Sequence, residues 1–549
     1  MATTPVRIKL YDTTLRDGAQ AEGVSFSLND KLSVAYRLDD FGIDFIEGGY
    51  PASNEKDEAF FERVAEKSPK SAIICAFGMT RRKGVKPSDD AGLAKLVGCG
   101  APIVTIVGKS SAFQATDVLC VSLEENLAMI DETIQYAVSL GKRVFYDAEH
   151  FFDGWKSDPE YALETLRVAV RAGSEVVVLC DTNGGSMPDE VSNGVTAALQ
   201  AVRAASPDRT VEIGIHTHND CGLAVANSLV AVDSGATLVQ GTINGIGERC
   251  GNADLLVVAA NLAFKKNGRY EVLSTGALER ATALSRFMYE LANVNPTPGQ
   301  PYFGASAFAH KGGMHVSGIN RNSNSYEHIP PESVGNERRV LVSELSGKAN
   351  IVAFLKKYNL QDDKTLNQET IAKILDKVTC EESQGYQYEA ADGSFKLLVS
   401  KVKGEFTPSF SRLNFQTSVV VTDVNETLTT KATVATVKLR VGSQGEILHE
   451  VAEGDGPVDA LNNALRKALE TIYPELRDVK LVDYKVRVLN SDAGTAATTR
   501  VIIESKDGEE RWSTVGVSEN VVEASWIALC DSIEYKLAKS YNAKEKNAH

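Results

Sequence analysis

Residues 6–18 read VRIKLYDTTLRDG, a β-rich apolar run that ends in the polar residues Arg16 and Asp17. Seven further runs of this kind begin at residues 44, 72, 102, 143, 175, 212 and 238, and a stretch with helical periodicity lies between successive runs. Eight strand-and-helix units over roughly 250 residues are typical of a (β/α)8 barrel. The alternative is a doubly wound open sheet, but no glycine-rich dinucleotide motif follows the first strand.

The polar ends of these eight runs are expected to converge. In barrels of this type the active site lies at the carboxyl ends of the strands. One polar end would mean little, but eight ends that meet describe a polar cup above an apolar interior. The residues at these ends are Arg16, Asp17, Glu47, Asp147, Glu149, His150, Asp181, Thr182, Asn183, His216, His218, Asn219, Asp220, Asn244, Glu248, Arg249 and Asn252.

His216-Thr217-His218 is the most informative chemical motif in the chain. Residues i and i+2 of a strand face the same side, so two imidazoles project together from the seventh strand. Two histidines and one oxygen ligand form an open site for a divalent metal ion. Asp17 fits as the third ligand, and Asn252 is a candidate for a fourth, neutral oxygen. The alternative is a histidine pair that only hydrogen-bonds inside the cup.

Other strand-end residues suit the chemistry around such a metal. Arg16 stands beside Asp17, and a guanidinium near a metal favours a developing alkoxide or enolate, with a structural ion pair as the alternative. Glu149 and His150 end the fifth strand and are candidates for proton transfer, although His150 suits a supporting role equally well. Thr182 is placed to hydrogen-bond a substrate carboxylate, but residues in such turns also act as caps.

The chain divides into three expected regions. Residues 1–280 form the barrel, residues 281–400 a linker with helical subdomains, and residues 412–540 a C-terminal α+β domain. The linker is rich in Gly, Pro, Ser and Asn over residues 296–333 and shows helical patterns over residues 336–358 and 367–378.

The C-terminal domain contains a weak internal repeat, in which Val437 corresponds to Val501 and Ala464 to Ala528. Each copy reads as three strands and a helix, which predicts two βββα units. The seam between them would suit a small ligand, and the alternative is a dimerisation domain without one.

Composition excludes several classes of function. The chain has 549 residues and a net charge of −15, which argues against nucleic acid or an anionic membrane as a partner. No apolar run of about 18 residues appears, so no membrane span is expected. The eight cysteines show no CxxC spacing and are typical of a reduced, cytoplasmic protein.

Several motifs together resemble the alpha-isopropylmalate and homocitrate synthase family. They are LRDGAQ at residues 15–20 followed by Lys31, HTHND at 216–220, GIGERCGN at 245–252 and AHKGGMH at 309–315. The resemblance spans nearly the whole chain and includes the LeuA-type allosteric domain. It implies an acyltransferase that joins acetyl-CoA to a 2-oxo acid in a Claisen-type condensation and then hydrolyses the thioester. YDAEHFFDGW at residues 146–155 and GKSS at 108–111 most resemble the branch that uses pyruvate, forms citramalate and starts isoleucine formation.

The resemblance also implies roles for single residues. Arg16 would stabilise the oxygen anion formed on the oxo acid. The ligands of a divalent ion (Mn²⁺, Mg²⁺ or Zn²⁺) would be Asp17, His216, His218 and Asn252.

Four further residues match positions near the substrates, and a fifth, Asp147, departs from the family pattern there. Thr182 would hold the carboxylate of the oxo acid, and Asp147 stands where related enzymes carry a tyrosine beside that acid. Glu149 matches a catalytic carboxylate. His315 and Tyr326, in the linker, match a histidine implicated in enolising acetyl-CoA and a nearby tyrosine.

Family members are homodimers whose linkers reach over the partner's barrel, so a homodimer is expected, with His315 serving the partner's site. The C-terminal domain is expected to bind isoleucine as an inhibitor, or leucine if the substrate is branched.

Three other readings stay open. The first is 2-isopropylmalate synthase, which uses 3-methyl-2-oxobutanoate in leucine formation, although Val316 departs from the glutamine common in that branch. The second is a metal-dependent acyl-CoA lyase or aldolase of the same superfamily, which generally lacks the C-terminal repeat. The third is a non-catalytic amino-acid sensor, which predicts loss of the residues of the barrel mouth.

Overall fold

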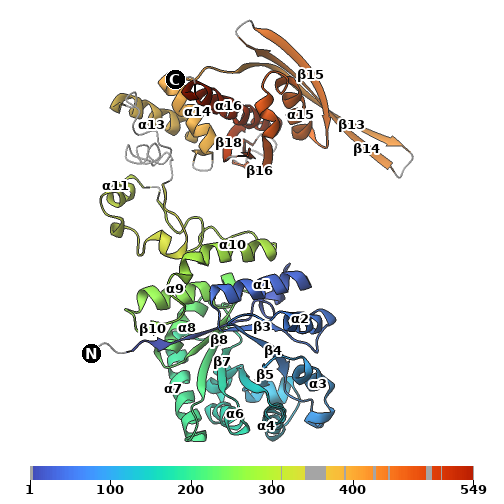
Figure 1. Cartoon of the computed structure of the whole chain (residues 1–549), viewed down its shortest axis with the longest axis vertical. Helices are drawn as coiled ribbons and strands as arrows, with labels where there is room; N and C mark the ends of the chain where they lie inside the picture. The colour runs from blue at the N-terminus through green and yellow to red at the C-terminus, as the bar shows by residue number, and fades with distance from the viewer. Residues whose placement is uncertain are drawn as a thin grey trace. The chain divides into compact units, whose positions relative to one another are not determined.

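The eight expected strands close into one parallel barrel in the computed structural model of the chain (Figure 1). They are β2 (Lys9–Asp12), β3 (Phe45–Gly49), β4 (Ile73–Met79), β5 (Ile103–Lys109), β6 (Arg143–Glu149), β7 (Val176–Asp181), β8 (Glu212–Thr217) and β9 (Leu238–Gly241). β2 pairs with both β3 and β9, and Lys9 lies opposite Leu238. The barrel prediction is therefore confirmed, and the open sheet is excluded because the first and last strands of the barrel are hydrogen-bonded.

The structure describes residues 4–310, 312–340, 367–388, 391–424, 428–442, 445–489, 497–508 and 510–547. These residues form two units. The first contains Met1–Phe308 and Ile329–Arg338, and the second contains Ala309–His328 and Arg339–His549. Each unit is described by itself.

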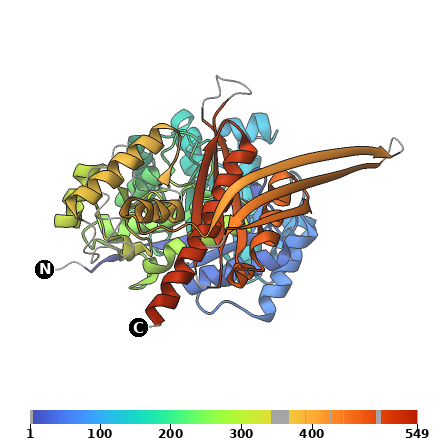
Figure 2. The same ribbon diagram turned by 90° about the horizontal axis from the view of Figure 1, so that it is seen from above.

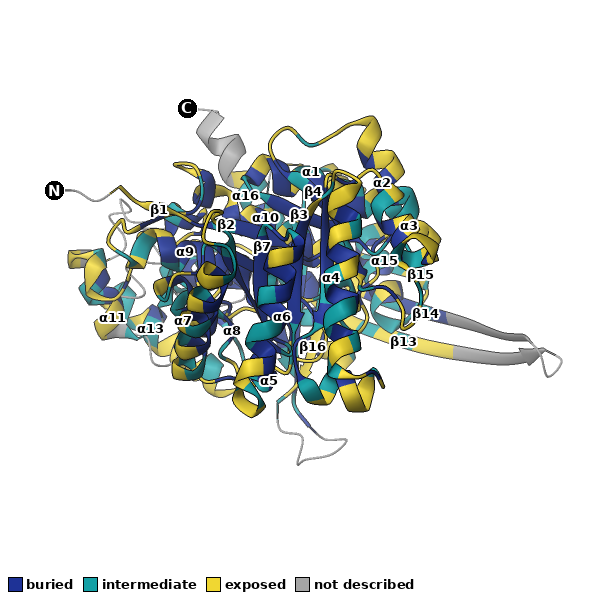
Figure 3. Ribbon diagram, turned by 90° about the horizontal axis from the view of Figure 1, so that it is seen from below, coloured by how far each residue is buried: buried dark blue, intermediate teal, exposed yellow. Residues whose placement is uncertain are grey.

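A ring of amphipathic helices covers the outside of the barrel. Figure 3 shows their exposed outer faces in yellow and the buried strands in dark blue. On α6 the buried residues Ala162, Leu166 and Ala169 recur at helical spacing and face the core. The helices are α1 (Leu28–Phe41), α2 (Glu55–Glu66), α3 (Ala91–Gly98), α4 (Leu123–Ser139), α5 (Phe151–Ser157), α6 (Pro159–Ala172), α7 (Pro188–Ala205), α8 (Ala224–Asp233) and α9 (Leu255–Lys265).

Aromatic side chains fill the interior of the barrel. Tyr11, Phe45 and Phe145 pack with ring centroids 5.2 to 6.2 Å apart, each almost fully buried. The hydroxyl of Tyr11 donates to Glu47 over 2.8 Å and lies 2.7 Å from the hydroxyl of Thr105. This layer is a closed floor, so the polar cup has no passage through the barrel.

Short strands and helices lie before and after the barrel in the chain, and they belong to both units. In the first unit, β1 (Val6–Arg7) pairs with β10 (Tyr270–Glu271), and α10 (Ala281–Leu291) contacts α1. In the second, β11 (Ala309–His310) pairs with β12 (Arg339–Val340), and α11 (Gly313–Arg321) follows β11.

The two helices expected in the linker have different outcomes. The pattern over residues 336–358 lies mostly outside the described residues. Its described part contains strand β12, which pairs with β11, so the expected helix is wrong there. The helix expected over residues 367–378 is confirmed as α13 (Gln368–Ser383), which contacts α14 (Asp392–Lys403).

The two predicted βββα units are confirmed. One is the antiparallel sheet of β13 (Phe410–Val424), β14 (Leu428–Val441) and β15 (Glu446–Gly454) with α15 (Pro457–Leu469). The other is the sheet of β16 (Lys480–Val488), β17 (Thr499–Lys506) and β18 (Arg511–Ser518) with α16 (Val521–Asn547). Figure 2 shows β13 and β14 as a long antiparallel pair in orange. Among the described helices, none combines the length and apolar character that a membrane span requires.

Asp12, at the end of β2, makes the stability of the barrel depend on pH. Burial raises its pKa from 3.8 to about 7, although Thr14 donates to it from its hydroxyl and its amide. Because this folded-state pKa exceeds the unfolded value, folding loses stability as pH rises from about 4 to about 7, by at most about 1.4 kcal/mol per pH unit.

We expect Asp12→Asn to remove this dependence. The melting temperature of the variant, relative to the parent protein, should rise between pH 5 and pH 7 in scanning calorimetry and then level off. Asp208→Asn, at an exposed loop position, serves as the control and should show no such trend. A difference that stays constant across this range would contradict the raised pKa.

Candidate functional site

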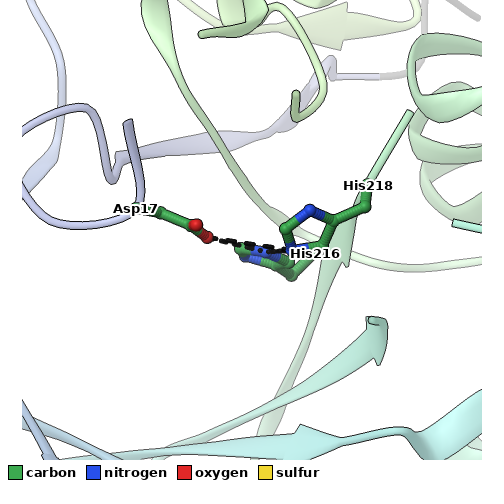
Figure 4. Close-up of side chains that lie close together, drawn as sticks. All are labelled: Asp17, His216 and His218. Atoms are coloured by element: carbon green, nitrogen blue, oxygen red, sulfur yellow. Dashed lines mark hydrogen bonds and ion pairs between the residues drawn. The ribbon is translucent and has the colours of Figure 1, made fainter. Parts of the chain in front are cut away.

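Asp17, His216 and His218 lie together at the carboxyl ends of the barrel strands (Figure 4). The Nε2 atoms of the two histidines are 3.3 Å apart. The Oδ2 atom of Asp17 lies 3.3 Å from His216 Nε2 and 3.9 Å from His218 Nε2. One ligand atom from each residue falls within 4.8 Å of the other two, and all three residues are buried. The structure thus brings together three of the four residues that the sequence suggests as metal ligands.

Local contacts set the protonation of these residues. Burial alone would lower the pKa of His216, but the carboxylate of Asp17 outweighs it and raises that pKa. His216 Nδ1 lies 2.8 Å from Gln240 Oε1, which directs its Nε2 lone pair to the cluster. Burial, followed by the neighbouring His216, lowers the pKa of His218 to about 4, so this imidazole is neutral. Burial alone would raise the pKa of Asp17, but Arg16 and His216 outweigh it and hold that pKa well below its ordinary value.

Asn252 completes the ring of donors. Its Nδ2 atom lies 3.1 Å from Asp17 Oδ2 and 3.3 Å from His216 Nε2, and its buried Oδ1 has no partner among the described residues. Half a turn of the amide would point Oδ1 into the cluster, and the two orientations have the same shape. A carboxylate, two imidazoles and an amide oxygen form a set of acceptors without a donor, and such a set fits a divalent cation.

Gly247 leaves room for Asn252, which gives a test of the fourth ligand. A Cβ atom at Gly247 would fall 1.8 Å from Asn252 Oδ1, and Asn252 is only 2% exposed. We expect Gly247→Ala to push this amide away and to weaken Mn²⁺ binding about tenfold or more in titration calorimetry.

Gly185 provides the matched control, because a Cβ atom there would meet nothing within 4 Å. Gly185→Ala should bind Mn²⁺ as the parent protein does. Unchanged binding by Gly247→Ala would remove Asn252 from the ligand set.

Glu47, a strand-end residue with no role predicted from the sequence, holds Arg16 in place. The Nε atom of Arg16 donates to Glu47 Oε2 over 2.6 Å, and its Nη1 atom lies 3.6 Å from Asp17 Oδ2. The guanidinium also stacks on Phe77, 4.1 Å from the ring centroid. Glu47 is fully buried and is bonded to Tyr11 as well. An acidic residue inside the fully buried strand β3 was the sequence signal for this role.

One cavity of about 610 Å³ collects most of the expected site residues. Asp147 is buried and accepts from Gln240 Nε2 over 3.0 Å, and burial and Glu47 raise its pKa to about 7. The hydroxyl oxygen of Thr182 accepts from the amide of His150 over 2.8 Å, so its own proton remains available. Residues that line the cavity include Arg16, Asp17, Asp147, Glu149, Thr182, His216 and His218.

His315 and Tyr326 lie in the second unit and are therefore described apart from the cavity. Their rings stack with centroids 4.2 Å apart and an interplanar angle of 23°. Both side chains are exposed, whereas the neighbouring Val316 is buried. His315 and Tyr326 therefore pack against each other, and their role in the reaction at the barrel stays a prediction.

Three family descriptions match the chain. Residues 7–288 match HMGL-like proteins, residues 303–383 match the homocitrate synthase post-HMGL domain, and residues 389–537 match the LeuA allosteric (dimerisation) domain.

Curated relatives match over nearly the full length. An (R)-citramalate synthase of Geobacter sulfurreducens is 49% identical, covering 97% of this chain and 98% of the relative. The (R)-citramalate synthase of Synechocystis is 48% identical, covering 98% and 97%. A 2-isopropylmalate synthase of Methanocaldococcus jannaschii is 30% identical, covering 97% and 96%.

Proposed function

The chain belongs to the alpha-isopropylmalate and homocitrate synthase family, and we propose that it condenses acetyl-CoA with pyruvate to give citramalate and free CoA. The observation that carries this choice is the gap in similarity. Five (R)-citramalate synthases are 41 to 49% identical over nearly the whole chain, whereas two 2-isopropylmalate synthases and one further (R)-citramalate synthase are 30 to 32% identical. The reaction would start isoleucine formation from pyruvate.

The cavity supports this chemistry residue by residue. Asp17, His216, His218 and Asn252 would hold a divalent ion, for which Mn²⁺, Mg²⁺ and Zn²⁺ are all suitable. When bound, this ion would polarise the carbonyl of the oxo acid.

The other residues act on the two substrates. The hydroxyl of Thr182 donates a hydrogen bond to the carboxylate of pyruvate, beside Asp147. A carboxylate or imidazole, Glu149 or His315, removes a methyl proton from acetyl-CoA, and Tyr326 stacks on His315. Arg16 stabilises the negative charge that develops on the oxo-acid oxygen as the new carbon–carbon bond forms. Water then releases CoA from the thioester.

The test is CoA release, followed with a thiol reagent at fixed acetyl-CoA and added Mn²⁺. We expect kcat/KM for pyruvate to exceed that for 3-methyl-2-oxobutanoate by tenfold or more, about 1.4 kcal/mol in transition-state binding. The reverse preference would assign the chain to the isopropylmalate branch. No release with either acid would favour a lyase.

The second unit supports a homodimer controlled by isoleucine. The LeuA dimerisation match covers residues 389–537. A cavity of about 690 Å³ lies in this unit, where Asp459 and the cations Arg477 and Lys480 stand beside the apolar side chains of Val458 and Leu481. Such a cavity suits the ammonium, carboxylate and side chain of a branched amino acid.

We expect isoleucine to lower CoA release and raise the melting temperature of this dimer, with a smaller effect from leucine. Arg477→Ala should weaken both effects and leave activity without isoleucine unchanged. If neither amino acid alters activity or melting temperature, the regulatory proposal fails while the catalytic one stands.

A further inference from the structure

A second cavity adjoins the one that contains the metal cluster. Its volume is about 410 Å³, and its lining is mainly apolar, including Leu93, Leu96 and Met129. Lys109 and Glu149 line both cavities. They stand where the two spaces meet, so a molecule that occupied both cavities would lie beside them.

Lys109 and Glu149 form a fixed pair. They end the neighbouring strands β5 and β6 and lie opposite one another in register. Lys109 Nζ lies 2.6 Å from Glu149 Oε2, with the two side chains 15% and 26% exposed. The amide of Ser110 also donates to the carbonyl of Glu149 over 2.9 Å.

The backbone after Glu149 makes a sharp turn that holds this arrangement. His150 has a left-handed φ of 58°, which is unusual for a residue with a side chain. Its amide donates to Thr182, and its ring lies 3.2 Å from Asp153. Strain of this kind persists where the surrounding contacts over-determine it, and it concentrates at functional sites.

The ammonium of Lys109 has donors to spare. It carries three N–H bonds, and within the described part of the chain Glu149 is its one side-chain partner. A carboxylate and an ammonium on one cavity wall are the two groups that enolisation beside a carbonyl requires: a base for the carbon acid and a donor for the oxygen.

The geometry points to Lys109 as a further catalytic residue, which stabilises the enolate of the acetyl thioester that Glu149 generates. The carboxylate of Glu149 takes a methyl proton, and the electron pair of the broken C–H bond moves into a carbon–carbon double bond. The carbonyl pair moves onto oxygen, which accepts a hydrogen bond from Lys109. This enolate carbon then attacks the oxo acid, whose oxygen faces Arg16. The inference rests on the proposed function, because it assigns the enolate step of that condensation.

Kinetics with Lys109→Met, Lys109→Arg and trideuterated acetyl-CoA test this role. We expect Lys109→Met to lower kcat with pyruvate by about 100-fold, a typical loss for one oxyanion donor. The deuterium isotope effect on kcat should equal or exceed that of the parent enzyme, since proton removal becomes slower. Lys109→Arg, which keeps the charge, should retain more activity than Lys109→Met.

Lys9→Met is the matched control, because it removes another lysine–glutamate pair, Lys9–Glu212, at the opposite end of the same barrel. It should lower kcat less than threefold. A loss below tenfold in Lys109→Met, an isotope effect below that of the parent enzyme, or no advantage of arginine over methionine would each overturn the role of Lys109. Activity of the parent enzyme with pyruvate is measured first, so failure of the proposed function is seen separately.

Discussion

Replacing His218 with alanine is expected to abolish tight divalent-metal binding and, with it, nearly all CoA release. Its Nε2 atom faces Asp17 and His216, so the change removes one of the donors around the cation. Loss of an outer partner of a metal site typically costs 10- to 100-fold in affinity, and loss of a ligand should cost more than about 100-fold. Titration calorimetry with Mn²⁺ measures the affinity without reference to activity.

His218 is a better choice for this test than His216. The Nδ1 atom of His218 has no partner among the described residues, so within that part of the chain removal of this side chain breaks no side-chain hydrogen bond outside the cluster, whereas His216 also bonds Gln240. His449→Ala, at an exposed position on β15, is the control and should bind Mn²⁺ normally. If His218→Ala bound Mn²⁺ within threefold of the parent protein, the cluster would not be the metal site.

The barrel and the proximity of Asp17, His216 and His218 could be predicted from the sequence because both depend on short-range patterns. Each apolar run is long enough for one strand and ends in polar residues, and parallel strands bring those ends to one face. The i and i+2 spacing of His216 and His218 then fixes their common direction, whatever the register of the neighbouring strands. To predict that Asp17 lies near these histidines, only one further inference was needed, the closure of β2 against β9.

The partners of these residues could not be predicted in the same way, because they depend on register and packing. Glu47 supports Arg16 only because β3 lies beside β2 with the acidic side chain turned inward. The pairing of Lys109 with Glu149 follows from the alignment of β5 with β6, which no local pattern shows. His315 and Tyr326 lie in a separate unit, so the sequence places them in the linker but fixes no distance to the barrel.

Replacing Arg16 with lysine is expected to lower kcat with pyruvate by about 100-fold or more, although the positive charge is kept. The planar guanidinium donates to Glu47 through Nε, stacks on Phe77 and leaves its remaining N–H bonds for an oxygen anion. A lysine ammonium cannot reproduce this planar set of N–H donors, and the loss of one oxyanion donor costs about 10²- to 10³-fold in kcat. Steady-state kinetics at saturating acetyl-CoA and Mn²⁺ measure the loss.

Two further variants separate the oxyanion role of Arg16 from its structural role. Glu47→Gln keeps an acceptor for Arg16 Nε but removes the buried charge, so it should loosen the guanidinium and lower kcat less than Arg16→Lys. Arg143→Lys changes an exposed arginine that is also paired through Nε, and it should leave kcat unchanged. If Arg16→Lys kept kcat within threefold, with the Mn²⁺ affinity intact, the charge alone would suffice at this position. Stabilisation of the oxygen anion would then depend on the metal rather than on the guanidinium of Arg16, which Glu47 and Phe77 hold in place.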